Sequence, residues 1–492
     1  MNDSSSSRRA FLRAVAVGAG GIFVAPGLLS AMGDRRVSHD LIPAADAEGW
    51  DRVPDILRRI VPPKFRARDF VITSYGARGD GRVDCTVPIR RAIAECAAAG
   101  GGRVVVPDGN FLTGPIHLRS NVNLHLENGA TLLFSRDPRA YLPAVFTRFE
   151  GMEMMGYSPL IYAFEQENVA VTGAGTLDGQ AGDAYWWPWK GSKDHGWKTG
   201  DPQQKPARDR LSQMMEAGAP VAERVFADGS YMRPQFIQPY RCRNVLIEDV
   251  RIVNSPMWEI HPVLCTNVTV RRVKIKSHGP NNDGCDPESC HDVLIEECEF
   301  DTGDDCIAIK SGRNADGRRL KAPTENVVIR NCVMKDGHGG VTIGSEISGD
   351  VRWVFAERCT MDSPNLDRAL RLKTNAMRGG VLEHIYMRDV TIGEVADSIL
   401  QIDFNYEEGA KGPFLPVVRD INMQRVSSRK SNYALDLRGF PNAPITDVRL
   451  SECQFHNVAK GSIIENVRGL TLDRVSVNGK PVDAASIVEK GA

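Results

Sequence analysis

The sequence has almost no excess of charge of either sign: 61 Lys and Arg residues stand against 62 Asp and Glu residues, for a formal net charge of -1. This balance gives no reason to expect binding to nucleic acid or to an anionic membrane, although a local basic site for an acidic substrate is compatible with it. The sequence also lacks a long uninterrupted apolar run. The apolar stretch from residue 14 to about residue 32 is broken by glycines and does not predict a membrane span.

Complete disulfide pairing is excluded as well, because the 11 Cys residues are an odd number. Several of them recur at a position that a repeated pattern, described below, predicts to be buried. We therefore interpret those as small apolar core residues. An oxidising compartment could still form a few disulfides among them.

The N-terminus resembles an export signal. Residues 7–13 read S-R-R-A-F-L-R, which is similar to the twin-arginine pattern S-R-R-x-F-L-K, and residues 29–31 (L-S-A) form a plausible cleavage site. We predict that residues 1–32 are a twin-arginine export signal and that the mature protein is periplasmic or secreted, with no membrane contact after signal removal. The alternative is an N-terminal membrane anchor. Residues 33–69 are polar and contain Pro, which predicts a linker or a loosely docked lead-in, with ordered structure from Phe70 onward.

Helical patterns are scarce. One helix is predicted after residue 86, with Ile89, Ile93 and Ala97 on one face. Thr86 could cap its start, and Gly100–Gly102 would end it. Downstream, no second helical pattern is comparably clear. Short apolar runs separated by Gly, Asn and Asp follow instead, and they predict many short β-strands.

From Val245 onward one short pattern recurs. Eight-residue segments with alternating apolar residues start about 22 to 36 residues apart, and the sixth residue of each is Val or Cys. Alternation marks strands with one buried face, and recurrence at about two dozen residues is typical of solenoid coils. The sixth residues are Val250, Val273, Cys298, Cys332, Cys359, Val390, Val426, Cys453 and Val475.

Short β repeats with no helix between them predict an all-β fold. We expect a right-handed parallel β-helix, a single-stranded solenoid over residues 70–492 with a short N-terminal capping helix. A propeller blade would need about 40 residues and four strands, and a leucine-rich repeat would show a Leu/Asn pattern that is absent. Residues 183–232 interrupt the repeats, are polar and are rich in Trp, so we predict a long insertion from one coil. Its Trp side chains either stack on a sugar ring or hold the insertion against the solenoid.

Acidic residues are concentrated between residues 281 and 312, where Asp283 is followed by Asp304 and Asp305. Like charges raise each other's pKa, so such a cluster indicates a metal site or carboxyls that act as acid and base. Solvated turns are the alternative, because Asp and Gly are common in turns. The recurrence of the acids one structural repeat apart favours a site.

Three basic residues and one tyrosine follow at the corresponding position of later coils. His338, then Arg371 and Lys373, then Tyr406 come after successive repeat strands. Stacked strands lie about 4.8 Å apart, so these side chains should share one wall with the acids. An acidic group beside a basic pair suits an anionic substrate: one carboxyl donates a proton to a leaving oxygen while another activates water. Arg371 offers a planar fork to a carboxylate and Lys373 a point charge.

Four motifs on this wall resemble those of the polygalacturonase family, family 28 of the glycoside hydrolases. Its hallmarks are NTD, GDD, GHG and RIK. In the same order and at matching spacing, this chain has residues 281–283 (N-N-D), 303–305 (G-D-D), 337–339 (G-H-G) and 371–373 (R-L-K). Asn in place of Thr and Leu in place of Ile remove no reacting group. The resemblance implies a right-handed parallel β-helix and hydrolysis of α-1,4-linked galacturonic acid in pectin with inversion. From the residues alone, inversion and retention both stay open.

The resemblance also implies roles. Asp304 would be the general acid, while Asp283 and Asp305 would hold and deprotonate the water. His338 would support the protonation state of the acid or contact substrate. Substrate contacts are further expected from Arg371, Lys373, Asn281 and Tyr406. No metal or other cofactor is implied, and the expected partner is a pectic polysaccharide or oligogalacturonide.

Three segments look more like exo-acting bacterial members of the family: NSPMWEIHPVLC, DGCDPES and GHGGVTIGSE. The insertion at residues 183–232 could close one end of a groove and leave room only for a chain end. Three other functions remain open: a hydrolase of rhamnogalacturonan or another decorated pectin, a Ca²⁺-dependent pectate lyase with an Arg base, and a non-catalytic polysaccharide-binding β-helix.

Overall fold

Parallel β-sheets dominate the computed structural model, which describes residues 49–488. The predicted export signal lies outside these residues. The first sheet is made of β1 (Asp69–Val71), β3 (Gly102–Val106), β6 (Val122–Leu126), β11 (Glu167–Gly173), β15 (Arg243–Glu248), β17 (Thr266–Arg271), β19 (His291–Glu296), β22 (Thr324–Arg330), β25 (Val351–Glu357), β28 (Val381–Arg388), β31 (Val417–Gln424), β34 (Ile445–Ser451) and β37 (Val467–Asp473).

The second sheet runs beside it. It is made of β2 (Asp80–Asp84), β4 (Gly109–Thr113), β7 (Ala130–Phe134), β12 (Thr176–Asp178), β16 (Arg251–Val253), β18 (Lys274–Ser277), β20 (Glu299–Thr302), β23 (Val333–Met334), β26 (Thr360–Met361), β29 (Thr391–Glu394), β32 (Ser427–Lys430), β35 (Gln454–Phe455), β38 (Val475–Val477) and β39 (Lys480–Val482).

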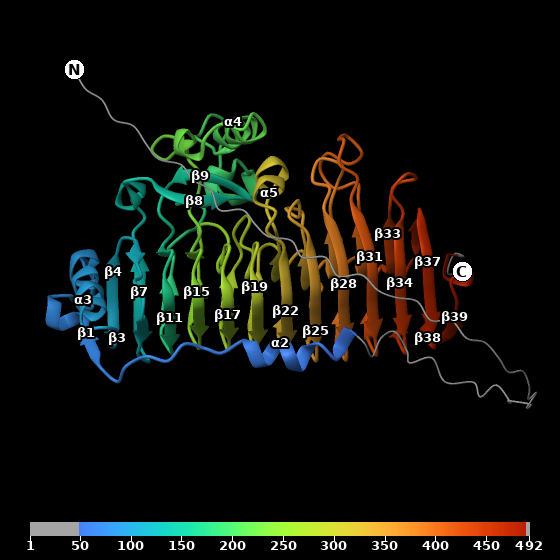
Figure 1. Cartoon of the computed structure of the whole chain (residues 1–492), viewed down its shortest axis with the longest axis horizontal. Helices are drawn as coiled ribbons and strands as arrows, with labels where there is room; N and C mark the ends of the chain where they lie inside the picture. The colour runs from blue at the N-terminus through green and yellow to red at the C-terminus, as the bar shows by residue number, and fades with distance from the viewer. Residues whose placement is uncertain (1–48, 489–492) are drawn as a thin grey trace, which may run out of the picture. The chain divides into compact units, whose positions relative to one another are not determined.

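The third sheet has two parts that isolated bridges through Ile260 and Cys285 join. One part contains β5 (Ile116–His117), β10 (Ile161–Phe164) and β14 (Ile237–Tyr240); the other contains β21 (Ile307–Ile309), β24 (Val341–Ile343), β27 (Arg368–Lys373), β30 (Ser398–Asp403), β33 (Tyr433–Arg438) and β36 (Ile463–Glu465). Successive coils contribute strands to all three sheets, so the fold is a parallel β-helix, as the repeats predict (Figure 1).

The repeat has a simple geometric basis. Val245, Val268 and Val293 pair in direct register, and the later copies continue the same column. The fifth residue of every copy, from Asp249 to Arg474, has a positive φ, which turns the chain sharply from the first sheet into the second. The sixth residue follows this corner and points into the core, where all nine copies are at most 2% exposed. Val and Cys fit there because they are small and apolar.

All 11 Cys residues are buried and unpaired, from Cys85 to Cys453. They fill the core as apolar side chains, which matches the interpretation of the repeat.

No helix within residues 49–488 is long and apolar enough to cross a membrane.

The predicted capping helix is α3 (Thr86–Ala98), which buries Ile89, Ala92, Ile93 and Cys96 against the first coils. The predicted role of Thr86 as N-cap is wrong, because Thr86 is the first helical residue and Cys85 occupies the cap position. The Thr86 hydroxyl instead donates to Asp84 and accepts from the Gly114 amide.

Ordered structure begins before Phe70, contrary to the expectation. Helix α2 (Val53–Arg59) lies across the first sheet, where Trp50, Val53, Ile56 and Ile60 pack against Leu294, Val328, Phe355 and Tyr386. Arg59 Nη2 lies 2.6 Å from Asp292 Oδ1. The sequence patterns did not predict this helix, because it is only seven residues long and its few apolar side chains find their packing partners only on the distant strands of the first sheet.

Residues 183–232 lie between β12 and β14 and fold over the coils. They contain the short helices η3 (Trp187–Lys190) and η4 (Lys193–His195), helix α4 (Lys205–Glu216) and strand β13 (Val225–Phe226). Helix α4 is a second helix that the sequence patterns did not predict. Strand β13 pairs with β9 (Met152–Gly156) of a hairpin whose other strand is β8 (Val145–Phe149). Figure 1 shows α4, β8, β9 and α5 (Asn314–Leu320) grouped along one side of the coils.

The Trp side chains of the insertion hold it in place. Trp186 is buried beside Tyr141 and Trp189, and Trp187 Nε1 donates to the Ser255 carbonyl at 2.9 Å. These contacts favour anchoring over a sugar platform for Trp186 and Trp187.

Candidate active site

The predicted site residues come together on the outer face of the third sheet. In β27, Leu370 and Leu372 point into the core, so the alternating Arg371 and Lys373 point outward. Thr342 of β24 pairs with Arg371 in register, and Gly284 donates its amide to the Asp305 carbonyl. Neighbouring coils therefore place residues that are remote in sequence on one wall, as predicted.

The three acids form one cluster. Asp283, Asp304 and Asp305 each have a carboxylate oxygen within 4.8 Å of the others. Asp305 is fully buried and accepts from Lys373 Nζ at 2.7 Å and from Thr342 Oγ1 at 2.9 Å. Burial raises the pKa of Asp305, but the charges of Lys373 and Arg371 outweigh burial and hold it below its ordinary value. Asp305 is therefore ionised at neutral pH.

Asp304 pairs with His338, whose Nδ1 lies 3.0 Å from Asp304 Oδ1. Burial raises the pKa of Asp304, but the hydrogen bond and charge of His338 outweigh burial, so this pKa lies below its ordinary value. The same contact raises the pKa of His338 to about 9. His338 thus contacts the carboxyl that the family resemblance assigns as the general acid.

Asp283 behaves in the opposite way. Burial, followed by the charge of Asp304, raises its pKa to about 8. The Lys310 ammonium, 3.6 Å from Asp283 Oδ2, offsets only part of this rise. The Asp283–Asp304 pair therefore holds one proton at neutral pH, which is the state that acid–base chemistry requires.

Lys310 is a site residue that the sequence analysis missed. Its buried Nζ lies 3.6 Å from Asp283, 3.4 Å from Asp286 and 3.5 Å from Glu346, and 4.3 Å above the Trp258 ring. The signal was present, because I-A-I-K-S at residues 307–311 has the same alternation as L-R-L-K-T at residues 370–374. Lys310 directly follows β21 and Lys373 ends β27, and these two strands align through β24.

These groups line a pocket of about 410 Å³. Of the predicted residues, those on its surface are Asn281, Asp283, Asp304, His338, Arg371, Lys373 and Tyr406. The Tyr406 ring lies 5.2 Å from Lys373 Nζ. Asn281 Oδ1 accepts from Lys190 Nζ and from Arg233 Nη2, both at 2.8 Å, so Asn281 also ties the insertion to the coils.

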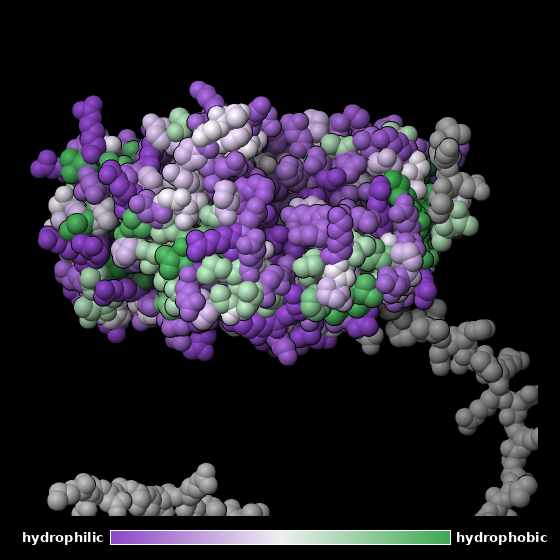
Figure 2. Space-filling model, turned by 90° about the horizontal axis from the view of Figure 1, so that it is seen from above, coloured by the Kyte–Doolittle hydropathy of each residue, from purple (hydrophilic) through white to green (hydrophobic). Residues whose placement is uncertain are grey.

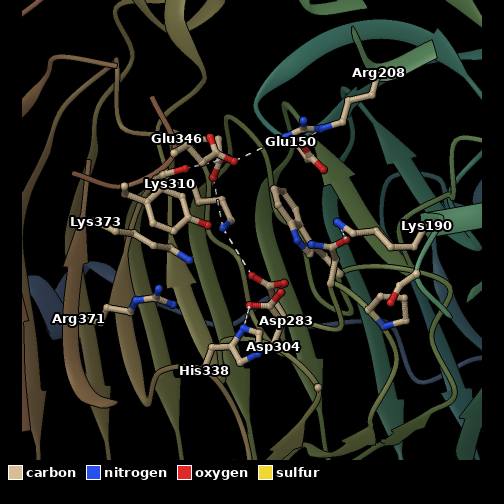
Figure 3. Close-up of a pocket in the computed structure, with 18 of the residues that line it drawn as sticks. Glu150, Lys190, Arg208, Asp283, Asp304, Lys310, His338, Glu346, Arg371 and Lys373 are labelled. Atoms are coloured by element: carbon tan, nitrogen blue, oxygen red, sulfur yellow. Dashed lines mark hydrogen bonds and ion pairs between the residues drawn. The ribbon is translucent and has the colours of Figure 1, made fainter. Parts of the chain in front are cut away.

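Other lining residues come from outside the regular coils. Lys190, His195 and Arg208 belong to the insertion, and Glu150 to the turn of the β8–β9 hairpin. Figure 3 shows Asp283, Asp304 and His338 between Arg371 and Lys373 on one side and Lys190 on the other. The face that carries α4 is mostly hydrophilic, with apolar residues only in scattered patches (Figure 2).

Within residues 49–488, two groups of side chains are close enough to share a cation. The first is the cluster of Asp283, Asp304 and Asp305, whose negative charge Lys310, Lys373 and Arg371 already balance without a metal ion. The second comprises His278, Asp301 and Asp336. There, His278 lies 2.7 Å from Asp301 while Ser363 and Asn365 donate to Asp336, and these contacts account for the cluster.

Comparisons with known proteins agree with this geometry. The family model of glycosyl hydrolases family 28 matches residues 225–477. A probable polygalacturonase of Vitis vinifera is 29% identical over 411 residues, which cover 80% of this chain and 76% of that protein. An exo-poly-alpha-D-galacturonosidase of Dickeya chrysanthemi is 27% identical over 462 residues, covering 84% and 74%.

A solved structure extends the match beyond sequence. The hyperthermoactive exopolygalacturonase from Thermotoga maritima superimposes with a TM-score of 0.86 and 47% sequence identity, covering 88% of this chain and 96% of that one. The chain belongs to glycosyl hydrolases family 28 and is a glycoside hydrolase.

Proposed function

We propose that this protein hydrolyses α-1,4-galacturonosidic bonds of polygalacturonate and releases galacturonate from a chain end. One observation carries the proposal: Asp283 and Asp304 line one pocket together with Arg371 and Lys373, and the buried Asp305 completes the carboxyl cluster behind them. The carboxyls act as acid and base in glycoside hydrolysis, and the two cations form a binding site for a uronate carboxylate. The 47% identity to an exopolygalacturonase supports the same substrate and chain-end action.

Asp304 is the proposed general acid. Before substrate binds, Asp304 is ionised and the proton of the pair resides on Asp283. A bound uronate adds negative charge beside the cluster and excludes water, and both changes raise carboxyl pKa values. In the proposed step the proton of the pair moves from Asp283 to Asp304. Asp304 donates it to the leaving oxygen, while the now ionised Asp283 and Asp305 hold the attacking water and accept its proton. Arg371 and Lys373 orient the uronate.

Inversion is proposed from family membership. The nearest oxygens of the three acids lie within 4.8 Å, closer than the roughly 6.5–9.5 Å carboxyl separation of typical inverting enzymes. Proton NMR during hydrolysis of trigalacturonate tests it directly. We expect the β-anomer to form first, because inversion at an α-linkage gives a β-product. Initial α-anomer would contradict inversion while leaving hydrolysis intact.

The test of the activity itself is a product analysis of polygalacturonate digested in the presence of EDTA. We expect saturated galacturonate from the wild type and about a thousandfold slower release from Asp304→Asn. Unsaturated products that require Ca²⁺ would indicate a lyase, and mixed saturated oligomers an endo-acting hydrolase. Absence of any product would indicate that the substrate is a decorated pectin or that the protein binds polysaccharide without cleaving it.

We further propose export by the twin-arginine route to the periplasm or beyond. Residues 7–13 carry the signal pattern, and the buried unpaired Cys residues are compatible with folding in a reducing cytosol before export. Replacement of Arg8 and Arg9 by Lys should leave the protein in the cytoplasmic fraction. Undiminished export of that variant would overturn the proposal.

A further inference from the structure

One end of the pocket is built from carboxylates. Glu150, at the turn of the β8–β9 hairpin with a φ of 44°, is 5% exposed and accepts from Arg208 Nε. Glu346, which follows β24, is 7% exposed and lies 3.5 Å from both Lys310 Nζ and Arg313 Nη1. Figure 3 shows Glu150, Glu346 and Arg208 together at the end of the pocket away from His338. We name Glu150 and Glu346 the end wall.

The end wall consists of two carboxylates, and the cations beside it, Arg208, Lys310 and Arg313, are already engaged in ion pairs. Burial raises the pKa of both carboxyls, but their basic neighbours outweigh burial and hold both below their ordinary value. Arg208 contacts Glu150 and, at 3.8 Å, Glu407. Both end-wall carboxylates are therefore ionised and held in fixed positions at neutral pH.

This chemistry suits hydroxyls and opposes carboxylates. An ionised carboxylate only accepts hydrogen bonds, and bonds from neutral hydroxyls to a charged acceptor are strong. A second anion beside it is disfavoured. The opposite side of the pocket, with Arg371 and Lys373, has the reverse preference. Every internal residue of polygalacturonate carries a carboxylate, so a chain that continued past the end wall would bring like charges together.

We propose that Glu150 and Glu346 recognise the free hydroxyls of a chain-terminal galacturonate and exclude a further uronate residue, which makes them determinants of chain-end action. The inference rests on the proposed hydrolysis of polygalacturonate and assigns the specificity of that same pocket. The non-reducing end offers a free 4-hydroxyl and the reducing end a free anomeric hydroxyl. The substrates below distinguish the two.

The test compares three trigalacturonates: the unmodified compound, a lyase product with a 4,5-unsaturated non-reducing end, and a compound reduced to the alditol at its reducing end. We expect kcat/KM of the wild type to fall at least about tenfold on one modified substrate and to change little on the other, because a site built to bond a hydroxyl rejects a ligand without it. The modified substrate with the lower kcat/KM shows which end of the chain, non-reducing or reducing, the end wall binds.

Two variants, Glu150→Gln and Glu346→Gln, locate the effect. Each variant should lower kcat/KM about tenfold on the unmodified trigalacturonate and change it little on the modified trigalacturonate that the wild type hydrolyses slowly. The ratio of the two kcat/KM values should therefore approach one. Glu167→Gln, an exposed carboxyl that pairs with Arg243 outside the pocket, is the matched control and should retain full discrimination. A variant that fails to fold leaves the comparison of the three substrates by the wild type intact as the test.

Equal hydrolysis of all three substrates by the wild type would overturn the end-wall inference alone. So would an equal loss on all three in both variants. Failure to hydrolyse any of them would overturn the proposed function and this inference with it.

Discussion

The pocket is lined by two regions that are built in different ways. The regular coils supply Asp283, Asp304 and Arg371 from neighbouring positions along one parallel sheet, and strand register fixes their spacing. The insertion supplies Lys190 from the end of the short helix η3, and the β8–β9 hairpin supplies Glu150 from its turn; only long-range packing positions these two segments. The coils therefore position the reacting groups, while the irregular segments shape what can enter.

The largest expected effect is on a coil residue. Asp304→Asn should lower kcat by a factor of about 10³, within the 10²–10⁴ range for loss of a general acid or base. Reducing-sugar release from polygalacturonate measures it, with Asp249→Asn at an exposed corner as the control. A kcat within tenfold of wild type would show that another group protonates the leaving oxygen.

A second coil residue should affect both activity and stability. Lys310→Met leaves Asp283, Asp286 and Glu346 without their shared cation, and breaking a buried ion pair typically costs about 3–5 kcal/mol. We expect a clear fall in melting temperature and at least about tenfold lower kcat. Lys276→Met, which removes an exposed ion pair to Asp301, is the matched control. If both variants melt alike, Lys310 does not hold the cluster.

A residue of the insertion should change binding more than chemistry. Lys190→Ala removes the cation that donates to Asn281 at the pocket rim. We expect KM for trigalacturonate to rise about tenfold with kcat nearly unchanged, the pattern for a contact made equally in ground and transition states. Lys193→Ala in the same insertion is the control. A loss confined to kcat would place Lys190 among the reacting groups and erase the contrast between the two regions.

The last expected effect is on stability as a function of pH and leaves the reaction itself aside. The pKa of Asp283 is about 8 when folded, against about 3.9 when unfolded. Its protonation therefore stabilises the fold fully below about pH 4, and this contribution is lost as pH rises to about 8. Asp283→Asn does not titrate, so its melting temperature relative to wild type should rise between pH 4 and 8. A constant difference across that range would contradict the buried, protonated carboxyl.

The same contrast explains what the sequence could reveal. Val250 and Cys298 revealed the repeat in the sequence because each follows a corner that recurs at the same place in every coil. The outward direction of Arg371 and Lys373 could be predicted from the alternation of side chains along a strand. Lys310 obeys the same alternation and could have been found by aligning the third-sheet strands. These features are local or periodic, so the sequence carries them.

The remaining parts depend on contacts that no local pattern encodes. Glu150 reaches the pocket because β9 pairs with β13 from the insertion, about seventy residues away along the chain. Helix α2 is stable only where Trp50 and Ile56 meet Phe355 and Tyr386. Neither segment repeats, and neither has a partner nearby in sequence, so only the three-dimensional packing reveals them.

The central claim is that the coil-borne carboxyls and cations hydrolyse a uronate linkage at a chain end. Its most direct test is the length and saturation of the first products that the wild-type protein releases from polygalacturonate in EDTA, measured by mass spectrometry. The account predicts saturated galacturonate monomer from the start of the digest. Unsaturated products, or early oligomers of mixed length, would contradict it.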